Sequence, residues 1–393
     1  MGIGVTIKLG IIEIIIAWEQ RKIHDVFIER SERSGDGELI SVTINSGVVK
    51  SADLDRHDSS SDDKSNYKKV EIGDIAYNSM RMWQGASGYS PYSGILSPAY
   101  TVITPNEGIN SEFFAYQFKQ YNMIQTFKRN SQGLTSDTWN LKFSALGSIK
   151  INVPSFEEQT KIAEFLKCSD TLITLHQRKL DRLKQMKQGY LQQMFPKNGE
   201  SVPRLRFADF YGEWEQRKLG EVAEFNPKSI LPDKFEYVDL ESVIETNLIS
   251  HRTETKESAP SRAQRLARKG DVFYQTVRPY QKNNYLFNLS YNNYVFSTGY
   301  TQMRPYVDSN FLLGRLQEER FVKNVLDRCT GTSYPAINSN DLADIEIKVP
   351  VIKKEQIQIG LLFMNLDHLI TLHQSMLDRL KSLKKVYLQK MFT

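Results

Sequence analysis

A chain of 393 residues is long enough for two or three domains of ordinary size. Its composition, with 40% hydrophobic and 25% charged residues but only 22 Gly and 13 Pro, excludes the disordered, collagenous and low-complexity classes. The 51 basic and 46 acidic residues leave a net charge of +5, too small by itself to indicate a nucleic-acid-binding protein. Cys168 and Cys329 lack zinc-site spacing and form no disulfide framework, so we expect a reducing cytoplasm.

Residues Ile3 to Ala17 form an apolar segment, densest from Gly10 to Ala17. Lys8 and Glu13 interrupt it, and it is shorter than the about 20 apolar residues that a membrane span needs. A basic start and a small-residue cleavage site, which would indicate a signal peptide, are not evident. We expect a strand or a short helix buried in the fold, and no association with a membrane.

An internal repeat with a period near 197 residues covers the rest of the chain. The motif W-E-Q-R-K begins at Trp18 and again at Trp214, and Gly73-Asp74 returns as Gly270-Asp271. The end of each half matches best, because 170–195 and 367–392 are identical at 18 of 26 positions without a gap. The preceding part of each half matches only at short motifs. Two similar frames with two dissimilar modules suggest one task performed on two different half-targets.

Each half ends in a pattern that predicts a long helix. Val153-Pro154 and its counterpart Val349-Pro350 each close a segment with the alternation of a strand. Ser155 and Glu158 then form a capping box, and no proline interrupts the run from Glu157 to Met194. A helix of about 40 residues would be roughly 60 Å long.

A heptad pattern gives each of these helices a seam in which mostly apolar residues are mixed with His and Lys. The seam positions are Ile173, His176, Leu180, Leu183, Lys187, Tyr190 and Met194 in the first helix, and Ile370, His373, Leu377, Leu380, Lys384, Tyr387 and Met391 in the second. We expect the two helices to pack on each other around an internal pseudo-twofold. The alternative is that each helix lies on its own domain. His176 and His373 are expected at seam or surface positions, and a metal-ligand pair is the less favoured interpretation.

These patterns predict an α+β protein with four parts. Modules of mixed strands and helices occupy residues 1–154 and 201–350, and helical regions occupy 155–200, with its linker, and 351–393. Turn residues from Pro196 to Pro203 mark the boundary between the halves.

The variable modules contain side chains of the kinds that contact DNA. Arg pairs with guanine edges and Asn or Gln with adenine, while small hydroxylated residues beside Gly let the backbone approach phosphate. The basic stretch from Arg262 to Lys269 adds local positive charge. The candidates are Arg81, Trp83, Gln84, Ser131, Gln132, Thr135 and Ser136 in the first half, and Arg265, Arg268, Arg278, Tyr280, Lys282, Asn283, Thr332, Ser333 and Tyr334 in the second. The alternative for any one of them is an ordinary solvated loop.

Searches for catalytic motifs find little. Nucleotide-binding glycine loops and H-E-x-x-H are absent from the sequence, and its six His have no metal-ligand spacing. Asp233, Glu254 and Lys256 could hold Mg²⁺ and orient a water for phosphodiester hydrolysis, but the first half has no equivalent. A magnesium-dependent nuclease is therefore the alternative function, and a coiled-coil scaffold without a DNA role is a third hypothesis.

The ordered set of repeated motifs, from Trp18 to Phe392, resembles the specificity (S) subunits of type I restriction-modification enzymes. This resemblance implies two target-recognition domains, each binding one half of a split double-stranded DNA sequence, and two helical regions that form an antiparallel coiled coil. It also implies a non-catalytic chain without a cofactor of its own. Two methyltransferase (M) subunits with S-adenosylmethionine, and restriction (R) subunits with ATP and Mg²⁺, are the implied partners.

One part of the chain departs from the family pattern. The second half approaches its Trp through the segment from Pro203 to Phe210, which looks typical of S subunits. The first half has Gly2 to Ala17 at that place, without a match. The start of the first domain is therefore in question.

Overall fold

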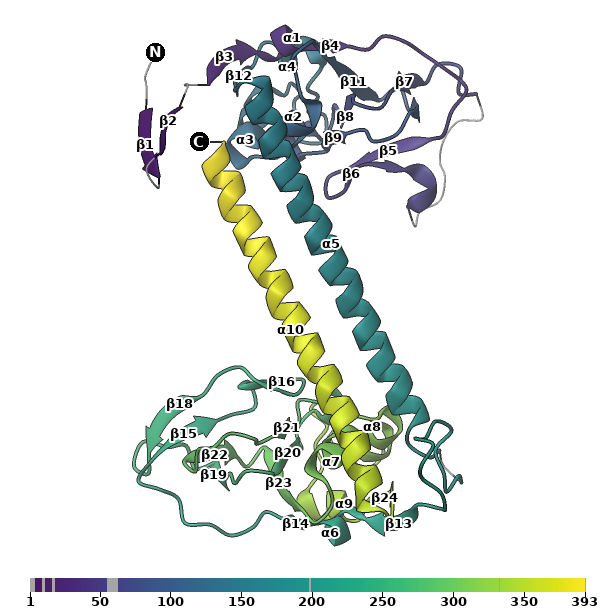
Figure 1. Ribbon diagram of the computed structural model, residues 1–393, viewed down its shortest axis with the longest axis vertical. Coiled ribbons are helices and arrows are strands. Elements are labelled where there is room, and N and C mark those ends of the chain that lie inside the picture. Colours follow the sequence, from purple (N-terminus) through teal and green to yellow (C-terminus); the bar gives the residue numbers. More distant parts are fainter. Residues whose placement is uncertain are drawn as a thin grey trace. The chain divides into compact units, whose positions relative to one another are not determined.

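The protein is described by a computed structural model that covers residues 4–8, 11–15, 18–54, 63–197, 199–331 and 333–392, with the first two ranges described by their backbone alone. The chain divides into two compact units, residues 1–174 together with 378–393, and residues 175–377. The long helices α5 (Phe156–Gln193) and α10 (Lys353–Met391) each contribute one part to each unit (Figure 1). In the described ranges, no helix is both long and apolar enough to cross a membrane.

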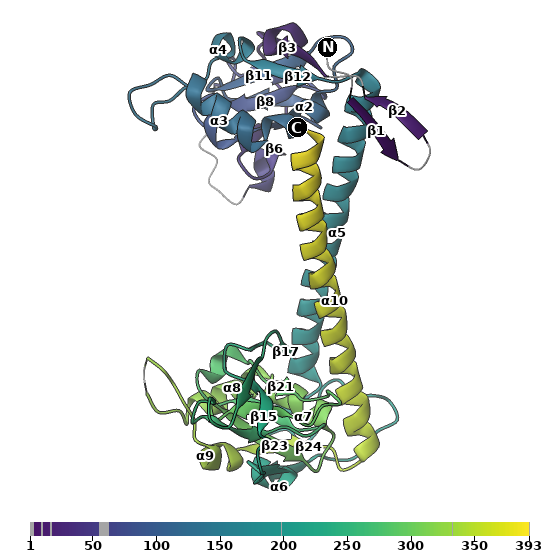
Figure 2. The ribbon, with the colours of Figure 1, turned by 90° about the vertical axis from the view of Figure 1, so that its left-hand side faces the viewer.

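The variable module of the first unit is built on a four-stranded antiparallel sheet in the order β4-β11-β8-β9. Two-stranded pairs β5-β6, β7-β10 and β3-β12 accompany it, and helices α2 and α3 lie against one side of the four-stranded sheet (Figure 2). The elements are β3 (Glu19–Lys22), α1 (Ile23–Val26), β4 (Phe27–Glu29), β5 (Ile40–Thr43), β6 (Gly47–Lys50), η1 (Ser51–Asp53), β7 (Lys68–Val70), β8 (Ile75–Asn78), η2 (Met82–Gln84), β9 (Ser87–Tyr89), β10 (Gly94–Leu96), β11 (Tyr100–Pro105), α2 (Ser111–Phe118), α3 (Tyr121–Asn130), α4 (Phe143–Gly147) and β12 (Lys150–Val153).

The described parts of the N-terminal apolar segment are strands, which is one of the two alternatives predicted from sequence. β1 (Gly4–Lys8) pairs with β2 (Ile11–Ile15) in antiparallel register. The described side chains begin at Trp18, so the predicted burial of this segment lies outside the described structure.

The second unit repeats the same plan with an added sheet. Its sheet β14-β23-β20-β21 corresponds to that of the first unit, and a further mixed sheet has the order β18-β15-β22-β19. The elements are β13 (Glu215–Lys218), α6 (Leu219–Val222), β14 (Ala223–Phe225), β15 (Lys234–Val238), β16 (Val243–Ile244), β17 (Asn247–Leu248), β18 (Arg252–Thr255), β19 (Ala263–Leu266), β20 (Val272–Gln275), η3 (Pro279–Gln281), β21 (Tyr285–Leu286), β22 (Tyr294–Ser297), β23 (Tyr300–Pro305), α7 (Ser309–Leu316), α8 (Glu319–Leu326), α9 (Ser339–Ala343) and β24 (Glu346–Val349).

The repeated Gly-Asp motif has a structural role in both units. Gly73 and Gly270 adopt positive φ angles of 99° and 95°, which favour glycine. The buried carboxylate of Asp74 then accepts two hydrogen bonds from the guanidinium of Arg30, at 2.8 and 3.0 Å. Asp271 accepts the same pair of bonds from Arg304, at 2.9 and 3.0 Å. The motif therefore holds the turn before β8 and β20 to the neighbouring strands, and its recurrence reflects the fold.

The beginning of α5 follows the predicted cap in part. The backbone N–H of Glu158 donates to the hydroxyl of Ser155 at 3.3 Å, as a capping box requires. The Glu158 carboxylate, however, accepts a hydrogen bond from the indole N–H of Trp18 at 3.0 Å. In the second unit Trp214 donates to Glu355 in the same way, at 3.2 Å. This contact between the first strand of a module and its helix explains why Trp and Glu recur together.

The last residue of each repeat anchors a helix end. Phe392, next to the end of α10, packs with Trp18 and Phe113 of the first unit, at centroid distances of 6.1 and 5.1 Å. Phe195, next to the end of α5, packs with Trp214 and Phe311 of the second unit, at 6.2 and 5.7 Å. Each helix therefore begins beside the module of its own half and ends beside the module of the other half.

Candidate nucleic-acid interface

In the first unit, the segment after β8 lies against the loop that follows α3. The ring of Trp83 meets that of Trp139 edge to face, with 5.2 Å between centroids. The backbone N–H of Leu141 donates to the carbonyl oxygen of Ser79 at 2.9 Å. The ammonium group of Lys128 lies 5.6 Å from the centre of the Trp139 ring. The two predicted DNA-contacting segments of this module are therefore neighbours.

The loop from Ser131 to Asn140 is held by its own hydrogen bonds. Gln132 and Asn140 exchange both backbone hydrogen bonds, at 3.0 and 2.8 Å, and the hydroxyl of Thr138 donates to the Thr135 carbonyl at 2.9 Å. The Ser131 hydroxyl donates to the carbonyl of Phe127 at 2.8 Å, which terminates α3. The predicted contacts Gln132, Thr135 and Ser136 are exposed along this loop.

A short turn presents the remaining predicted residues of the first unit. The carbonyl of Arg81 accepts from the backbone N–H of Gln84 and of Ala86, at 2.9 and 3.2 Å. Gly85 closes the turn with a φ of 85°. The side chains of Arg81, Trp83 and Gln84 are half-buried along it.

The second unit brings the equivalent segments together around Arg278. This residue has a φ of 54°, in the left-handed region that a residue with a side chain occupies at a cost. Its backbone N–H donates to the Pro335 carbonyl at 2.8 Å, and its guanidinium lies 4.5 Å from the centre of the Tyr334 ring. Tyr334 is exposed, so the stacked pair faces solvent.

Other predicted residues of this module have partners within the protein. The ammonium group of Lys282 pairs with Glu319, and the side-chain oxygen of Asn283 accepts from the backbone N–H of Glu245 at 2.8 Å. These contacts hold the loop after β20 to α8 and to the β16-β17 turn. Tyr280 lies between Arg278 and Lys282 and is half-exposed. Direct contacts of Lys282 and Asn283 with DNA remain predictions.

The basic stretch before β20 is divided between burial and exposure. Arg265 in β19 is half-buried, and its burial lowers the pKa of the guanidinium. Arg268 is exposed, while its backbone N–H donates to Asp271 at 2.8 Å. Ser333 is exposed beside Tyr334, and Thr332 lies outside the described residues.

Within each unit α5 and α10 run antiparallel along the predicted seam. In the second unit His176 faces His373, and Lys187 pairs with Asp367 at 2.5 Å. In the first unit Asp170 pairs with Lys384, and the ring of Phe165 packs on that of Tyr387 at 5.0 Å. The seam residues Leu180, Leu183, Ile370 and Leu377 are buried, and Ile173, Tyr190 and Leu380 are half-buried.

The nuclease-like residues form a structural cluster. The ammonium of Lys256 pairs with Asp233 at 2.6 Å and lowers the pKa of that carboxyl. The carboxylate of Glu254 accepts from Arg252 at 2.8 Å and from the hydroxyl of Ser258 at 2.7 Å. Across the described residues, no three or more His, Cys, Asp or Glu side chains gather in a way that could hold a metal ion.

Two residues that lie beside the predicted DNA contacts were not predicted from the sequence. Trp139 and Lys128 lie beside Trp83, but neither stands in a motif shared by the two halves. The available signal was a tryptophan within an exposed polar loop, where an aromatic ring has no core to join.

Comparison with known proteins assigns the chain. A family model described as the type I restriction modification DNA specificity domain matches it twice, at residues 16–185 and 211–382. The chain belongs to the type I specificity-subunit family. This result confirms the resemblance seen in the sequence and the predicted α+β fold with two repeated domains and long helices.

Individual relatives of this specificity subunit agree. The MjaVIII specificity subunit of Methanocaldococcus jannaschii is 21% identical over 355 residues, which are 84% of this chain and 82% of the relative. The MjaIX specificity subunit of the same organism is 30% identical over 143 residues, 35% of this chain and 33% of the relative. The crystal structure of the S subunit from M. genitalium shares the fold, with a TM-score of 0.62, 15% identity and coverage of 96% of this chain and 97% of the other. The protein is thus the DNA-specificity subunit of a type I restriction-modification system, and the nuclease alternative has no support.

Proposed function

We propose that each module contacts one half of the bipartite DNA target through two neighbouring segments, the one after β8 or β20 and the loop after α3 or α8. The supporting observation is that these segments meet in both units although their sequences differ. Trp83 meets Trp139 in one unit, and Arg278 meets Tyr334 in the other. An arrangement that both units share, but with different side chains in each, suits two modules that recognise different sequences.

The chemistry of the exposed groups fits this role. An arginine stacked on Tyr334 loses little conformational freedom when it pairs with a guanine edge. Gln132, Thr135 and Ser136 offer donors and acceptors on a loop that its own turns keep ordered. Lys128 adds a positive charge beside Trp139, which suits a nearby phosphate.

We also propose that the helices dock the methyltransferase subunits, and that restriction subunits join the complex. Apolar side chains remain exposed along both helices, for example Leu172, Leu175, Leu369, Leu372 and Met376. Exposed apolar stripes of this kind mark contact surfaces. In this proposal S-adenosylmethionine, ATP and Mg²⁺ act in the partner subunits. The chain itself binds DNA in the cytoplasm and performs no catalysis.

Methylation mapping of the assembled methyltransferase tests the assignment of segments to half-sites. Arg278→Ala should relax recognition of one half-site by about 1–3 kcal/mol if the side chain pairs with guanine. Trp139→Ala should relax the other half-site and leave the first intact. Lys256→Ala is the matched surface control, because Lys256 belongs to neither segment and pairs with Asp233. Equal losses at both half-sites would overturn the assignment. Magnesium-dependent cleavage by the purified chain alone would overturn its non-catalytic role.

A further inference from the structure

A tyrosine in the first unit joins its module to the long helices. The hydroxyl of Tyr116 on α2 donates to the carboxylate of Asp170 on α5 at 2.7 Å. The other oxygen of that carboxylate pairs with Lys384 on α10, whose ammonium lies 5.4 Å from the centre of the Tyr116 ring. The phenol therefore fills the space between α2 and the two helices, and its hydroxyl completes the hydrogen bonding of Asp170.

The second unit repeats the surroundings of this tyrosine. Ser111 at the start of α2 donates to the carbonyl of Gly73 at 2.5 Å, and Ser309 at the start of α7 donates to that of Gly270 at 2.8 Å. Because both serines make the same contact, they align the sequence of α2 with that of α7. Counting five residues on from each serine places Gly314 where the first unit has Tyr116.

The second unit has no tyrosine at the position of Tyr116, but it keeps the carboxylate that would accept the hydrogen bond of a tyrosine hydroxyl. Asp367, the repeat counterpart of Asp170, pairs with Lys187 at 2.5 Å, as Asp170 pairs with Lys384. In the described part of the second unit, no hydroxyl takes the place that the Tyr116 hydroxyl has on Asp170. The burial of Asp367 raises the pKa of its carboxyl, and Lys187 opposes that effect.

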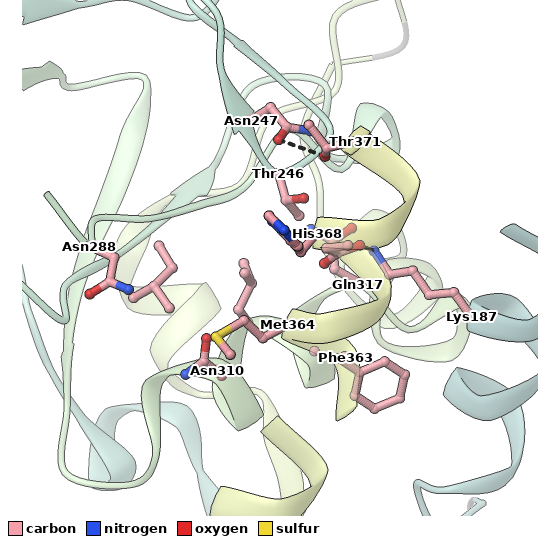
Figure 3. Close-up of a pocket in the computed structure, with 14 residues that line it drawn as sticks. Lys187, Thr246, Asn247, Asn288, Asn310, Gln317, Phe363, Met364, His368 and Thr371 are labelled. Atoms are coloured by element: carbon pink, nitrogen blue, oxygen red, sulfur yellow. Dashed lines mark hydrogen bonds and ion pairs between the residues drawn. The ribbon is translucent and has the colours of Figure 1, made fainter. Parts of the chain in front are cut away.

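A cavity of about 220 Å³ lies beside Gly314 and Asp367 (Figure 3). Gly314, Leu313, Phe363 and Met364 line it beside Asp367. Phe363 takes part of the room above the glycine, because a Cβ there would lie 3.1 Å from its ring. The remaining volume exceeds the roughly 150 Å³ of an engineered cavity that binds benzene. The space is thus large enough for one substituted aromatic ring.

The polar lining suits a ring that carries a hydrogen-bond donor. Thr371 donates to the side-chain oxygen of Asn247 at 3.1 Å on one side of the cavity (Figure 3). His368 and Asn310 line it as well. Asp367 also lines a second cavity of about 280 Å³.

We propose that this cavity binds a phenol group, with the ring against Leu313 and Met364 and the hydroxyl donating to Asp367. The ligand would restore in the second unit the contact that Tyr116 makes within the first. The phenol can come from a free small molecule or from a tyrosine side chain of a partner subunit.

Binding of 4-methylphenol, which is the side chain of tyrosine as a free molecule, tests the proposal. Titration calorimetry on the full chain should show one site, and 4-methylphenol should bind at least about tenfold more tightly than toluene, which lacks the hydroxyl. Asp367→Asn keeps the shape of the cavity and removes its charge, so it should reduce this preference several-fold. Failure of 4-methylphenol to bind, or affinities for the two ligands that are equal and insensitive to Asp367→Asn, would overturn the proposal.

The first unit supplies the matched controls. Tyr116→Gly should create a second site beside Asp170 and raise the stoichiometry from one to two. Tyr116→Phe removes only the hydroxyl and should leave it at one. A Tyr116→Gly protein that folds and gains no site contradicts the proposal. If that variant does not fold, the comparison of 4-methylphenol with toluene on the unsubstituted chain decides. Loss of binding in the complex with the methyltransferase identifies a partner tyrosine as the source, whereas retained binding identifies a free small molecule.

Discussion

The Nδ1 atom of His176 lies 3.0 Å from the Nδ1 atom of His373, and the two residues are 197 positions apart, which is the period of the repeat. Each histidine therefore contacts its own counterpart. Two antiparallel helices related by a local twofold axis bring equivalent residues together in this way where they cross the axis. A hydrogen bond between two Nδ1 atoms needs one N–H donor and one bare nitrogen, so the contact is lost when both rings are protonated.

Acidification should therefore weaken the packing of the helices. Burial lowers the pKa of His373 below its ordinary value of 6.5, and the positive charges of His176 and Lys179 lower it further. Because the folded pKa is the lower one, the unfolded chain binds the proton first. The stabilisation is present above about pH 6.5 and is lost as the pH falls through the folded pKa.

Melting temperatures measured from about pH 8 to pH 5 check this prediction. His373→Gln should flatten the decline on the acid side, since glutamine does not titrate. His24→Gln, which changes an exposed histidine outside the two long helices, is the control. A His373→Gln curve that parallels the unsubstituted protein would argue against the histidine pair as the source.

The ends of the two helices should differ in their contribution to stability. Phe195 is 1% exposed and stacks on Phe363 in addition to its contacts with Trp214 and Phe311. Phe392 is only half-buried. Phe195→Ala should cost about 3–5 kcal/mol of unfolding free energy, and Phe392→Ala about half as much. Urea unfolding followed by tryptophan fluorescence measures both, and equal losses would contradict this packing argument.

The sequence predicted the repeat-based features well because they depend on periodicity. The helix expected at 157–194 is found at Phe156–Gln193, since a long amphipathic pattern between a proline and a turn leaves little choice. The seam positions followed from the same pattern. The facing of His176 and His373 depended on the expected packing of the two helices on each other.

The contacts within the modules could not be predicted in this way. Trp83 and Trp139 are 56 positions apart in loops without periodicity, and nothing local to either indicates their contact. The left-handed backbone of Arg278 depends on its hydrogen bond to Pro335, which is distant in sequence. The exchange of Tyr116 for Gly314 becomes visible only after the two helices are aligned through their contacts.

Two equivalent glutamates should show different sensitivities to substitution. Glu355 is fully buried and accepts two hydrogen bonds from Arg206, at 2.7 and 2.9 Å, besides the one from Trp214. Glu158 is half-buried and accepts from Trp18. Glu355→Ala removes the ion pair of a largely buried guanidinium, which keeps its hydrogen bonds to two backbone carbonyls, and should cost about 3–5 kcal/mol. Glu158→Ala should cost about 1 kcal/mol.

Amide hydrogen exchange separates these effects within a protein that has two units. Protection of β13 should fall sharply in Glu355→Ala, while protection of β3 should fall only slightly in Glu158→Ala. Glu355→Gln keeps an acceptor for Trp214 and loses the ion pair, so it should give an intermediate value. Similar losses for the two alanine variants would show that the arginine adds nothing at Glu355.

Substitutions at Arg278 should separate recognition from stability. The residue holds a left-handed conformation that costs about 1–2 kcal/mol with a side chain and nothing with glycine. Arg278→Ala keeps this strain, whereas Arg278→Gly removes it. The glycine variant loses somewhat more backbone entropy on folding, which offsets part of this gain. The glycine variant should therefore be more stable than the alanine variant by about 1 kcal/mol. Both remove the guanidinium and should weaken binding of the same half-site equally, by about 1–3 kcal/mol.

Thermal unfolding together with DNA binding at fixed salt measures the two effects separately. If the glycine variant bound more weakly than the alanine variant, the backbone conformation itself would contribute to recognition.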